Sequence, residues 1–189
     1  MKRKIVKDLM VPLSEYATVS EEATLYDAII ALEEAQKNFD QTKYRHRAIL
    51  IYDKNNHITG KISQLDILRA LEPKYAEVEQ EMRSGISRYG FSKKLLVMLR
   101  EQFQLYERPL EEVCQTAAMY KTKNVMYVPT EGEYVNEHDT LDVAIHRLVM
   151  GHHQSLLVTR DNDIKNIIGI LRKTDVFMAI SEAFKSCNL

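Results

Sequence analysis

Two short stretches of the chain place an acid at the same distance after a glycine. The first, GKISQLDI, covers residues 60–67, and the second, GILRKTDV, covers residues 169–176. Their acids, Asp66 and Asp175, fall where an extended pattern gives way to a helical one, so each carboxylate can accept both hydroxyls of a ribose at the positive end of a helix. The alternative is that each acid simply caps its helix. Three positions before the acid the stretches differ, with Ser63 in the first and Arg172 in the second.

The composition argues against a polyanionic partner and against a membrane protein. Lys and Arg number 26, and Asp and Glu number 27, so the net charge of -1 offers no attraction to a nucleic acid. No apolar run approaches the ~18 residues of a membrane span and no signal-peptide core follows Met1, so we expect a cytoplasmic chain. Cys114 and Cys187 lie far apart without CxxC spacing, which predicts plain thiols rather than a zinc site or a disulfide.

An internal repeat organises the chain. Residues 18–32, TVSEEATLYDAIIAL, match residues 134–148, YVNEHDTLDVAIHRL, in register, and the similar segments DLMVP and NVMYVP precede the two copies. In each copy apolar residues at i, i+3, i+4 and i+7 predict a helix, with Ser20 and Asn136 as the expected N-caps. Two strand-like runs and a final short helix follow. A unit of roughly 60 residues is too small to bury both faces of its sheet, so we expect the two units to pack together.

The segment between the copies, residues 73–123, has a different pattern. It is neither Gly/Ser-rich nor Pro-rich, so it is not a flexible linker. Helical spacing predicts one stripe formed by Leu95, Leu99, Phe103 and Tyr106, widened by Leu96, Val97 and Met98, and a second helix after Pro109 with Leu110, Val113, Cys114, Ala117 and Ala118 inward. We expect these helices to cover the module or a dimer seam, and the broad face around Leu96 to be buried there. The alternative is a helix dedicated to a partner protein.

These features resemble a tandem pair of cystathionine-β-synthase (CBS) domains. The resemblance rests on the doubled unit and on the Gly–Asp stretch that ends both copies, and it covers about residues 5–71 and 125–184. It implies an α+β fold in which two β-α-β-β-α repeats, residues 1–72 and 124–189, pack as one pseudo-twofold module with the helical segment 73–123 inserted between them. It also implies two ligand clefts between the repeats, AMP, ADP, ATP or S-adenosylmethionine as the ligand, and often a homodimer.

The resemblance also implies which residues bind the ligand. Basic residues before the middle strand of each repeat, in RHR (45–47) and GHHQ (151–154), would reach the phosphates, although a solvated loop is the alternative. A metal at His152 and His153 is not expected, because neighbouring strand residues point in opposite directions and no acid or thiol completes the set. The expected ligand-binding residues are Thr18, Val19, Arg45, His46, Arg47, Ala48, Ser63, Asp66, Tyr134, Val135, His153, Gln154, Ser155, Arg172, Thr174 and Asp175.

Arg172 departs from the family's Ser or Thr at this position. Ser63 can donate to a phosphate oxygen beside the free N–H groups of a helix start, whereas a guanidinium offers a planar fork. Either Arg172 grips the phosphates of a more highly phosphorylated nucleotide, or it pairs with a carboxylate and fills the cleft. Positive charge nearby in sequence, from Lys173, His153 and Arg160, favours the phosphate grip. Thr174 would then replace part of the missing hydroxyl.

The sequence therefore predicts a regulatory module that senses an adenine nucleotide and needs no cofactor, because it performs no reaction. What it regulates would lie on another chain, as an unidentified protein target, or on the surface of the dimer. The alternative is a scaffold that keeps the CBS fold with closed clefts and associates through its middle helices. An enzyme is disfavoured because the sequence has no GxxxxGK[ST], GxSxG or HExxH motif.

Overall fold

In the computed structural model, which describes residues 4–39, 45–82 and 92–186, the chain folds around two small β-sheets. The first repeat contains β2 (Thr18–Ser20), α1 (Leu25–Asn38), β3 (Ala48–Tyr52), β4 (Ile58–Ser63) and α2 (Gln64–Ala70). The second contains β5 (Tyr134–Asn136), α7 (Leu141–Met150), β6 (Ser155–Arg160), β7 (Asp163–Arg172) and α8 (Lys173–Ser186). The predicted α+β class and the β-α-β-β-α order are confirmed in both repeats.

Each repeat lends a short segment to the sheet of the other. The strand β1 (Val11–Pro12), although it precedes the first repeat, pairs antiparallel with β7, so the second sheet has the order β1-β7-β6-β5. Reciprocally, Tyr127 ahead of the second repeat exchanges two backbone hydrogen bonds with Lys61 of β4, at 2.9 and 3.0 Å. The first sheet has the order β2-β3-β4. This exchange explains why similar segments precede both copies of the repeat.

The glycines of the repeated stretches permit this exchange. A Cβ atom on Gly169 would lie 2.5 Å from the backbone oxygen of Val11, and one on Gly60 would lie 2.5 Å from Sδ of Met126 and 3.1 Å from the backbone oxygen of Tyr127. A side chain at either position would push the exchanged segment away from the sheet. The glycine of the motif is therefore required for close backbone approach.

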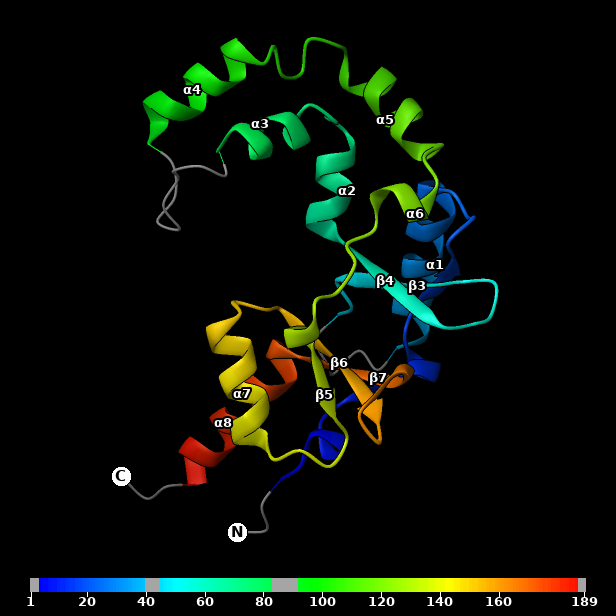
Figure 1. Cartoon of the computed structure of the whole chain (residues 1–189), viewed down its shortest axis with the longest axis vertical. Coiled ribbons are helices and arrows are strands. Elements are labelled where there is room, and N and C mark those ends of the chain that lie inside the picture. Colours follow the sequence, from blue (N-terminus) through cyan, green and yellow to red (C-terminus); the bar gives the residue numbers. More distant parts are fainter. Residues whose placement is uncertain (1–3, 40–44, 83–91, 187–189) are drawn as a thin grey trace.

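Three apolar clusters hold the module together. One lies between the first sheet and α1, and another between the second sheet and the helices α7 and α8. The third cluster joins the repeats and includes Leu50 of β3, Leu157 of β6 and Ile170 of β7, all nearly or fully buried. The two sheets lie next to one another in Figure 1. The sheet faces that meet in the third cluster are buried only when both repeats are present. This agrees with the expectation that a repeat of this size cannot bury both faces of its sheet alone.

The middle segment forms an arch of helices over α2, as Figure 1 shows. The arch is formed by α4 (Lys93–Gln102) and α5 (Leu110–Ala118), α3 (Tyr75–Met82) lies beneath it, and α6 (Thr122–Val125) leads back to the second repeat. Helix α5 buries Val113 and Ala117, but Leu110 is 65% exposed and Cys114 is an exposed free thiol. The predicted inward positions of Leu110 and Cys114 are therefore wrong, because α5 uses only a narrow edge against the first repeat.

The chain itself leaves the apolar face of α4 only partly covered. Leu95, Leu99 and Phe103 are half-buried, whereas Leu96 is 52% exposed. The expected burial against the module is therefore incomplete, and burial against a second copy stays a prediction.

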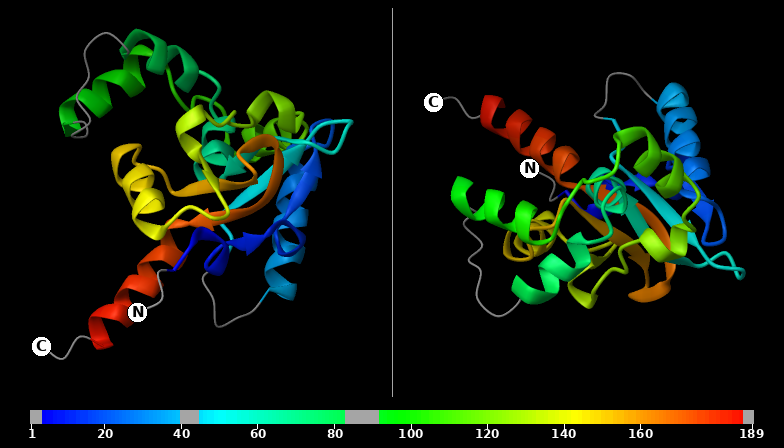
Figure 2. Two further views of the ribbon diagram at one scale, coloured as in Figure 1. Left: turned by 60° about the horizontal axis from the view of Figure 1, so that its bottom comes forward. Right: turned by 90° about the horizontal axis from the view of Figure 1, so that it is seen from above.

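Figure 2 shows α8 projecting away from the two sheets. In the described part of the chain, no helix has the length and apolar character that a bilayer crossing demands.

The helix starts differ from those predicted. Thr24 and Thr140 are the N-caps of α1 and α7, while Ser20 and Asn136 end the preceding strands. Thr24 accepts a hydrogen bond from the backbone N–H of Asp27 at 3.1 Å. A turn separates the strand from the helix in each repeat, so the N-cap is the threonine that follows the turn.

Candidate functional site

Two cavities occupy equivalent positions in the two repeats. The first cleft, of about 370 Å³, lies between α2 and the segment entering the second repeat, and is lined by Asp66, Arg69, Ala70, Pro73, Tyr75, Ala76, Glu79, Tyr120, Asn124, Val125, Met126 and Tyr127. The second cleft, of about 270 Å³, lies between α8 and the N-terminal segment, and is lined by Lys4, Asp8, Leu9, Met10, Val11, Arg172, Asp175, Met178, Ala179 and Glu182. Their equivalence follows from the reciprocal exchange of segments, since Asn124–Tyr127 and Asp8–Val11 are the matching exchanged residues.

In the first cleft, Asp66 has one carboxylate oxygen engaged by the helix start. Oδ2 accepts hydrogen bonds from the backbone N–H of Ser63 at 2.8 Å and from its hydroxyl at 2.6 Å, and the serine hydroxyl accepts from the N–H of Asp66 at 3.3 Å. This is a capping box, as the cap alternative predicts. The other oxygen, Oδ1, has a long ion pair of 3.9 Å with the half-exposed Arg69. Capping therefore leaves Oδ1 of Asp66 able to accept a hydrogen bond from a ligand.

In the second cleft, Arg172 takes both oxygens of Asp175. Nε donates to Oδ2 at 2.6 Å and the terminal nitrogen NH2 donates to Oδ1 at 2.6 Å. Arg172 stands immediately before α8, where Ser63 stands before α2, and it is only 5% exposed. Of the two roles expected for Arg172, the structure contains the pairing with a carboxylate.

A cluster from the first repeat packs around this ion pair. The NH1 atom of Arg172 lies 3.3 Å from Nδ1 of His46, and its guanidinium carbon lies 5.4 Å from the ring centroid of Phe39. The His46 ring also contacts Phe39 and Tyr16, at centroid distances of 4.1 and 4.4 Å. All four residues are buried. We call this cluster the latch; it consists of Tyr16, Phe39, His46 and Arg172. The latch joins the two repeats.

His46 does not supply the positive charge expected of it. Burial, and next the nearby charge of Arg172, lower the pKa of His46 from its ordinary value of 6.5 to about 4. At neutral pH its uncharged ring can accept a hydrogen bond from Arg172 through Nδ1. The predicted role of His46 as an anion-neutralising group is therefore wrong.

The lowered pKa predicts an acid-sensitive fold. The unfolded chain binds a proton at His46 near pH 6.5 and the folded chain only near pH 4, so protonation favours unfolding as the pH falls between these values. We expect His46 to lower the free energy of unfolding by about 2 kcal/mol between pH 7 and pH 5. Urea unfolding at the two pH values measures this change. His46→Gln should remove that part of the pH dependence, and an unaltered dependence in the variant would exclude His46 as its source.

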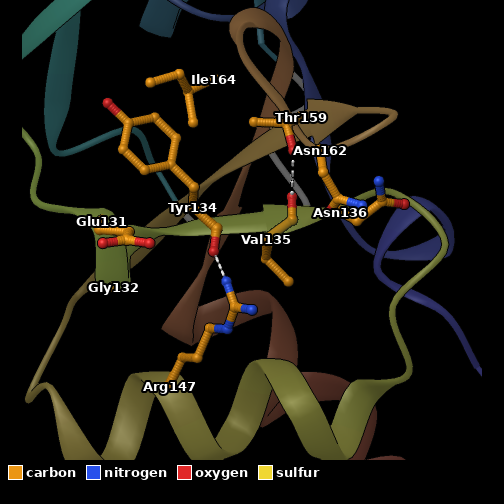
Figure 3. Close-up of a pocket in the computed structure, with 9 residues that line it drawn as sticks. All are labelled: Glu131, Gly132, Tyr134, Val135, Asn136, Arg147, Thr159, Asn162 and Ile164. Atoms are coloured by element: carbon orange, nitrogen blue, oxygen red, sulfur yellow. Dashed lines mark hydrogen bonds between the residues drawn. The ribbon is translucent and has the colours of Figure 1, made fainter.

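Other predicted site residues lie away from the clefts. The exposed Arg45 and Arg47 line a separate cavity of about 690 Å³ beside α1. Tyr134 and Val135 line one of about 430 Å³ at the other end of the second sheet (Figure 3). There Arg147 donates to the Tyr134 carbonyl, and the Thr159 hydroxyl donates to the Val135 carbonyl at 3.3 Å, so these polar groups are engaged by the backbone.

The remaining predicted residues lie in strands, in the turn before β6 and in the first turn of α8. Thr18 and Val19 belong to β2, and Ala48 and Ser155 begin β3 and β6; Val19 packs into the core of the first repeat. The Gln154 carbonyl accepts from the N–H of Lys173 at 2.9 Å, and Thr174 is the second residue of α8. His153 lies instead beside Glu133, with Nδ1 4.0 Å from Oε2. None of these seven lines either cleft, as far as the described residues define the cavities. Within the same described ranges, no group of three His, Cys, Asp or Glu residues could hold a metal ion.

A buried ion pair between the repeats has no counterpart in the sequence analysis. Nζ of Lys61 lies 2.5 Å from Oε2 of Glu133, and the Tyr127 hydroxyl donates to Oε1 at 2.5 Å. Burial alone would raise the pKa of Glu133, but hydrogen bonds from Lys61, Tyr127 and the backbone of Thr130 outweigh it and hold the pKa below its usual range. No local spacing signals a contact between residues so far apart in sequence.

Two exchanged α+β repeats with equivalent clefts at the starts of their last helices define a paired-repeat module. The family model described as CBS domain matches residues 6–73 and 120–182, so the chain belongs to the CBS domain family. This confirms the resemblance drawn from the repeated stretches. No curated protein is a sequence match for the chain.

Solved structures share the fold at low sequence identity. Protein MJ1004 from Methanocaldococcus jannaschii is 18% identical with a TM-score of 0.55; the alignment covers 95% of this chain and 60% of that one. CBSX2 in complex with AMP is 17% identical with a TM-score of 0.56, covering 95% and 98%. The CBS domain of the bacterial CNNM/CorC family Mg²⁺ transporter in complex with ATP is 14% identical with a TM-score of 0.58, covering 94% and 87%.

Proposed function

We propose that the chain is a regulatory module that binds an adenine nucleotide and catalyses no reaction. The observation that carries the proposal is the first cleft, in which Asp66 keeps Oδ1 available at a helix start. A carboxylate there can accept the hydroxyls of a ribose. The AMP and ATP complexes of two structural neighbours support adenine nucleotides as the ligand class.

The rest of the first cleft suits the other parts of a nucleotide. Tyr75, Tyr120 and Tyr127 line it, and an aromatic ring can stack on adenine. Arg69, whose side chain is 48% exposed and which bonds Glu79 at 2.9 Å, could turn to a phosphate at low cost, since exposed ion pairs are weak. In this proposal Asp66 receives the ribose, a tyrosine receives the base and Arg69 receives the phosphate.

Calorimetry tests the proposal directly. The chain is titrated with AMP, ADP, ATP and S-adenosylmethionine, with GMP as the comparison for base selectivity. Saturable heat with at least one adenine compound, and weaker heat with GMP, is expected. Absence of heat with all four adenine compounds would contradict nucleotide sensing and would favour the alternative function, a scaffold without a ligand. Steady release of phosphate or of AMP from the bound nucleotide would instead show an enzyme.

Asp66→Ala should weaken nucleotide binding by about 1.5–3 kcal/mol, roughly ten- to 150-fold, because a hydrogen bond to a charged acceptor is lost. The matched control is Asp27→Ala. Asp27 forms the same capping box with Thr24 at the start of α1, with hydrogen bonds of 2.7 and 2.9 Å, but lines neither cleft. Equal affinities for the two variants, measured by calorimetry, would remove Asp66 from the site.

We also propose that the module is a homodimer with a protein target. The partly exposed face of α4 supports this, since Leu96, Val97 and Met98 are each about half exposed. The same face supports the scaffold as a second candidate function. Nucleotide binding distinguishes the two, because a scaffold with closed clefts would assemble without it.

A further inference from the structure

We propose that only the first cleft binds a nucleotide, because in the second cleft Arg172 occupies the carboxylate that would receive the ribose. This inference rests on the proposed function and adds its stoichiometry, one nucleotide per chain. It makes Arg172 the residue that decides which of two equivalent clefts is used.

The first step concerns the acceptor. A ribose diol needs the face of a carboxylate, and in the second cleft a guanidinium already lies along that face, with one hydrogen bond of 2.6 Å to each oxygen of Asp175. The guanidinium thus stands in for the two ribose hydroxyls. In the first cleft the corresponding Ser63 reaches only Oδ2 of Asp66. A ligand must displace a bidentate ion pair in one cleft and no such pair in the other.

The second step concerns what holds Arg172 in place. Its side chain is 6% exposed, its NH1 atom lies against Nδ1 of His46, and its guanidinium lies over Phe39. Moving Arg172 toward a phosphate would remove the contacts with Asp175 and His46 together and open the packing between the repeats. The pair with Asp175 also cancels its charge locally. Arg172 is therefore poorly placed to serve a phosphate.

The third step concerns the cleft linings. The first cleft has three tyrosines for a base and Arg69 for a phosphate. At the matching position of Arg69 the second cleft has Met178, and its lining contains no aromatic residue among those the structure describes. Its one cation besides Arg172 in that lining is the exposed Lys4. Among the described residues, the second cleft therefore offers no ring for a base and, once Arg172 is engaged, only Lys4 for a phosphate, so it would be the weaker site even without the ion pair.

Counting bound ligand tests the inference. Equilibrium dialysis with AMP or ATP, whichever binds more tightly in calorimetry, should give one equivalent per chain for the parent. Asp66→Ala should abolish saturation in the concentration range in which the parent saturates. Arg172→Ser restores the residue type of the first cleft, frees Asp175 and lets a serine cap α8, so it should add a second equivalent that binds more weakly than the first and is counted at higher ligand concentration. Asp66→Ala combined with Arg172→Ser should return to one.

The outcomes separate the inference from the proposed function. Two equivalents in the parent, or one remaining in Asp66→Ala, would overturn the inference while leaving nucleotide sensing intact. A folded Arg172→Ser chain that still binds one equivalent would also overturn it. No binding by the parent would overturn both. Parent and Asp66→Ala alone decide the matter if thermal melting shows that Arg172→Ser does not fold.

Discussion

Asp175→Ala is expected to lower the free energy of unfolding by about 3–5 kcal/mol, because it leaves the guanidinium of Arg172 buried without its carboxylate. Arg172 is 5% exposed and makes its two short bonds to Asp175 alone. Its NH1 atom lies 3.3 Å from Nδ1 of His46, an uncharged ring that cannot replace a negative charge. Urea unfolding of parent and variant measures the difference.

The matched control is the same change at the equivalent position of the first repeat. Asp66→Ala removes a capping carboxylate from α2, but no buried cation depends on it, so we expect a loss of about 0.5–2 kcal/mol. The contrast between the two variants isolates the buried ion pair from the helix cap. Similar losses in both would mean that Asp175 acts only as a cap and that the latch contributes little.

Lys61→Met is expected to cost a similar amount, about 3–5 kcal/mol, because it removes the close cation of the buried Glu133 and leaves only the ionic contact of 4.0 Å with His153, which is charged only when protonated. The side chains of Lys61 and Glu133 are 13% and 2% exposed, and their atoms Nζ and Oε2 lie 2.5 Å apart. Methionine matches the length of the lysine stem, so packing is largely kept. Urea unfolding at neutral pH measures the loss.

Lys123→Met provides the control for that prediction. Lys123 and Glu22 form an ion pair of 2.7 Å, but their side chains are 43% and 61% exposed. An exposed pair contributes about 0–1 kcal/mol, so this variant should unfold nearly as the parent does. If Lys61→Met is as mild as Lys123→Met, then water reaches the ion pair of Glu133 and the pair is not a link between the repeats.

The sequence predicted the repeat and its elements because these depend on local periodicity. The helix period in residues 18–32 and 134–148 and the two strand runs of each copy were sufficient for the β-α-β-β-α order. The acids were placed correctly at the starts of α2 and α8 for the same reason. What failed locally was the choice among neighbouring polar residues, since Thr24 rather than Ser20 caps α1.

The rest depends on contacts between distant residues. Nothing in Val11 or Tyr127 signals that each pairs with the sheet of the other repeat, because a two-residue strand has no period of its own. His46 reads as an exposed cation in RHR, yet the aromatic rings of Tyr16 and Phe39 enclose it. Asp175, three residues after Arg172, was the one available signal for the latch, since i, i+3 pairs meet at a helix start.

The central claim is that an adenine nucleotide binds at Asp66 while Arg172 stays on Asp175. A crystal structure of the chain grown with the tightest-binding adenine nucleotide tests it most directly. The account predicts ribose hydroxyls within about 3 Å of the Asp66 carboxylate and an unchanged Arg172–Asp175 pair. A nucleotide bound to Asp175, with Arg172 turned onto its phosphates, would contradict the account.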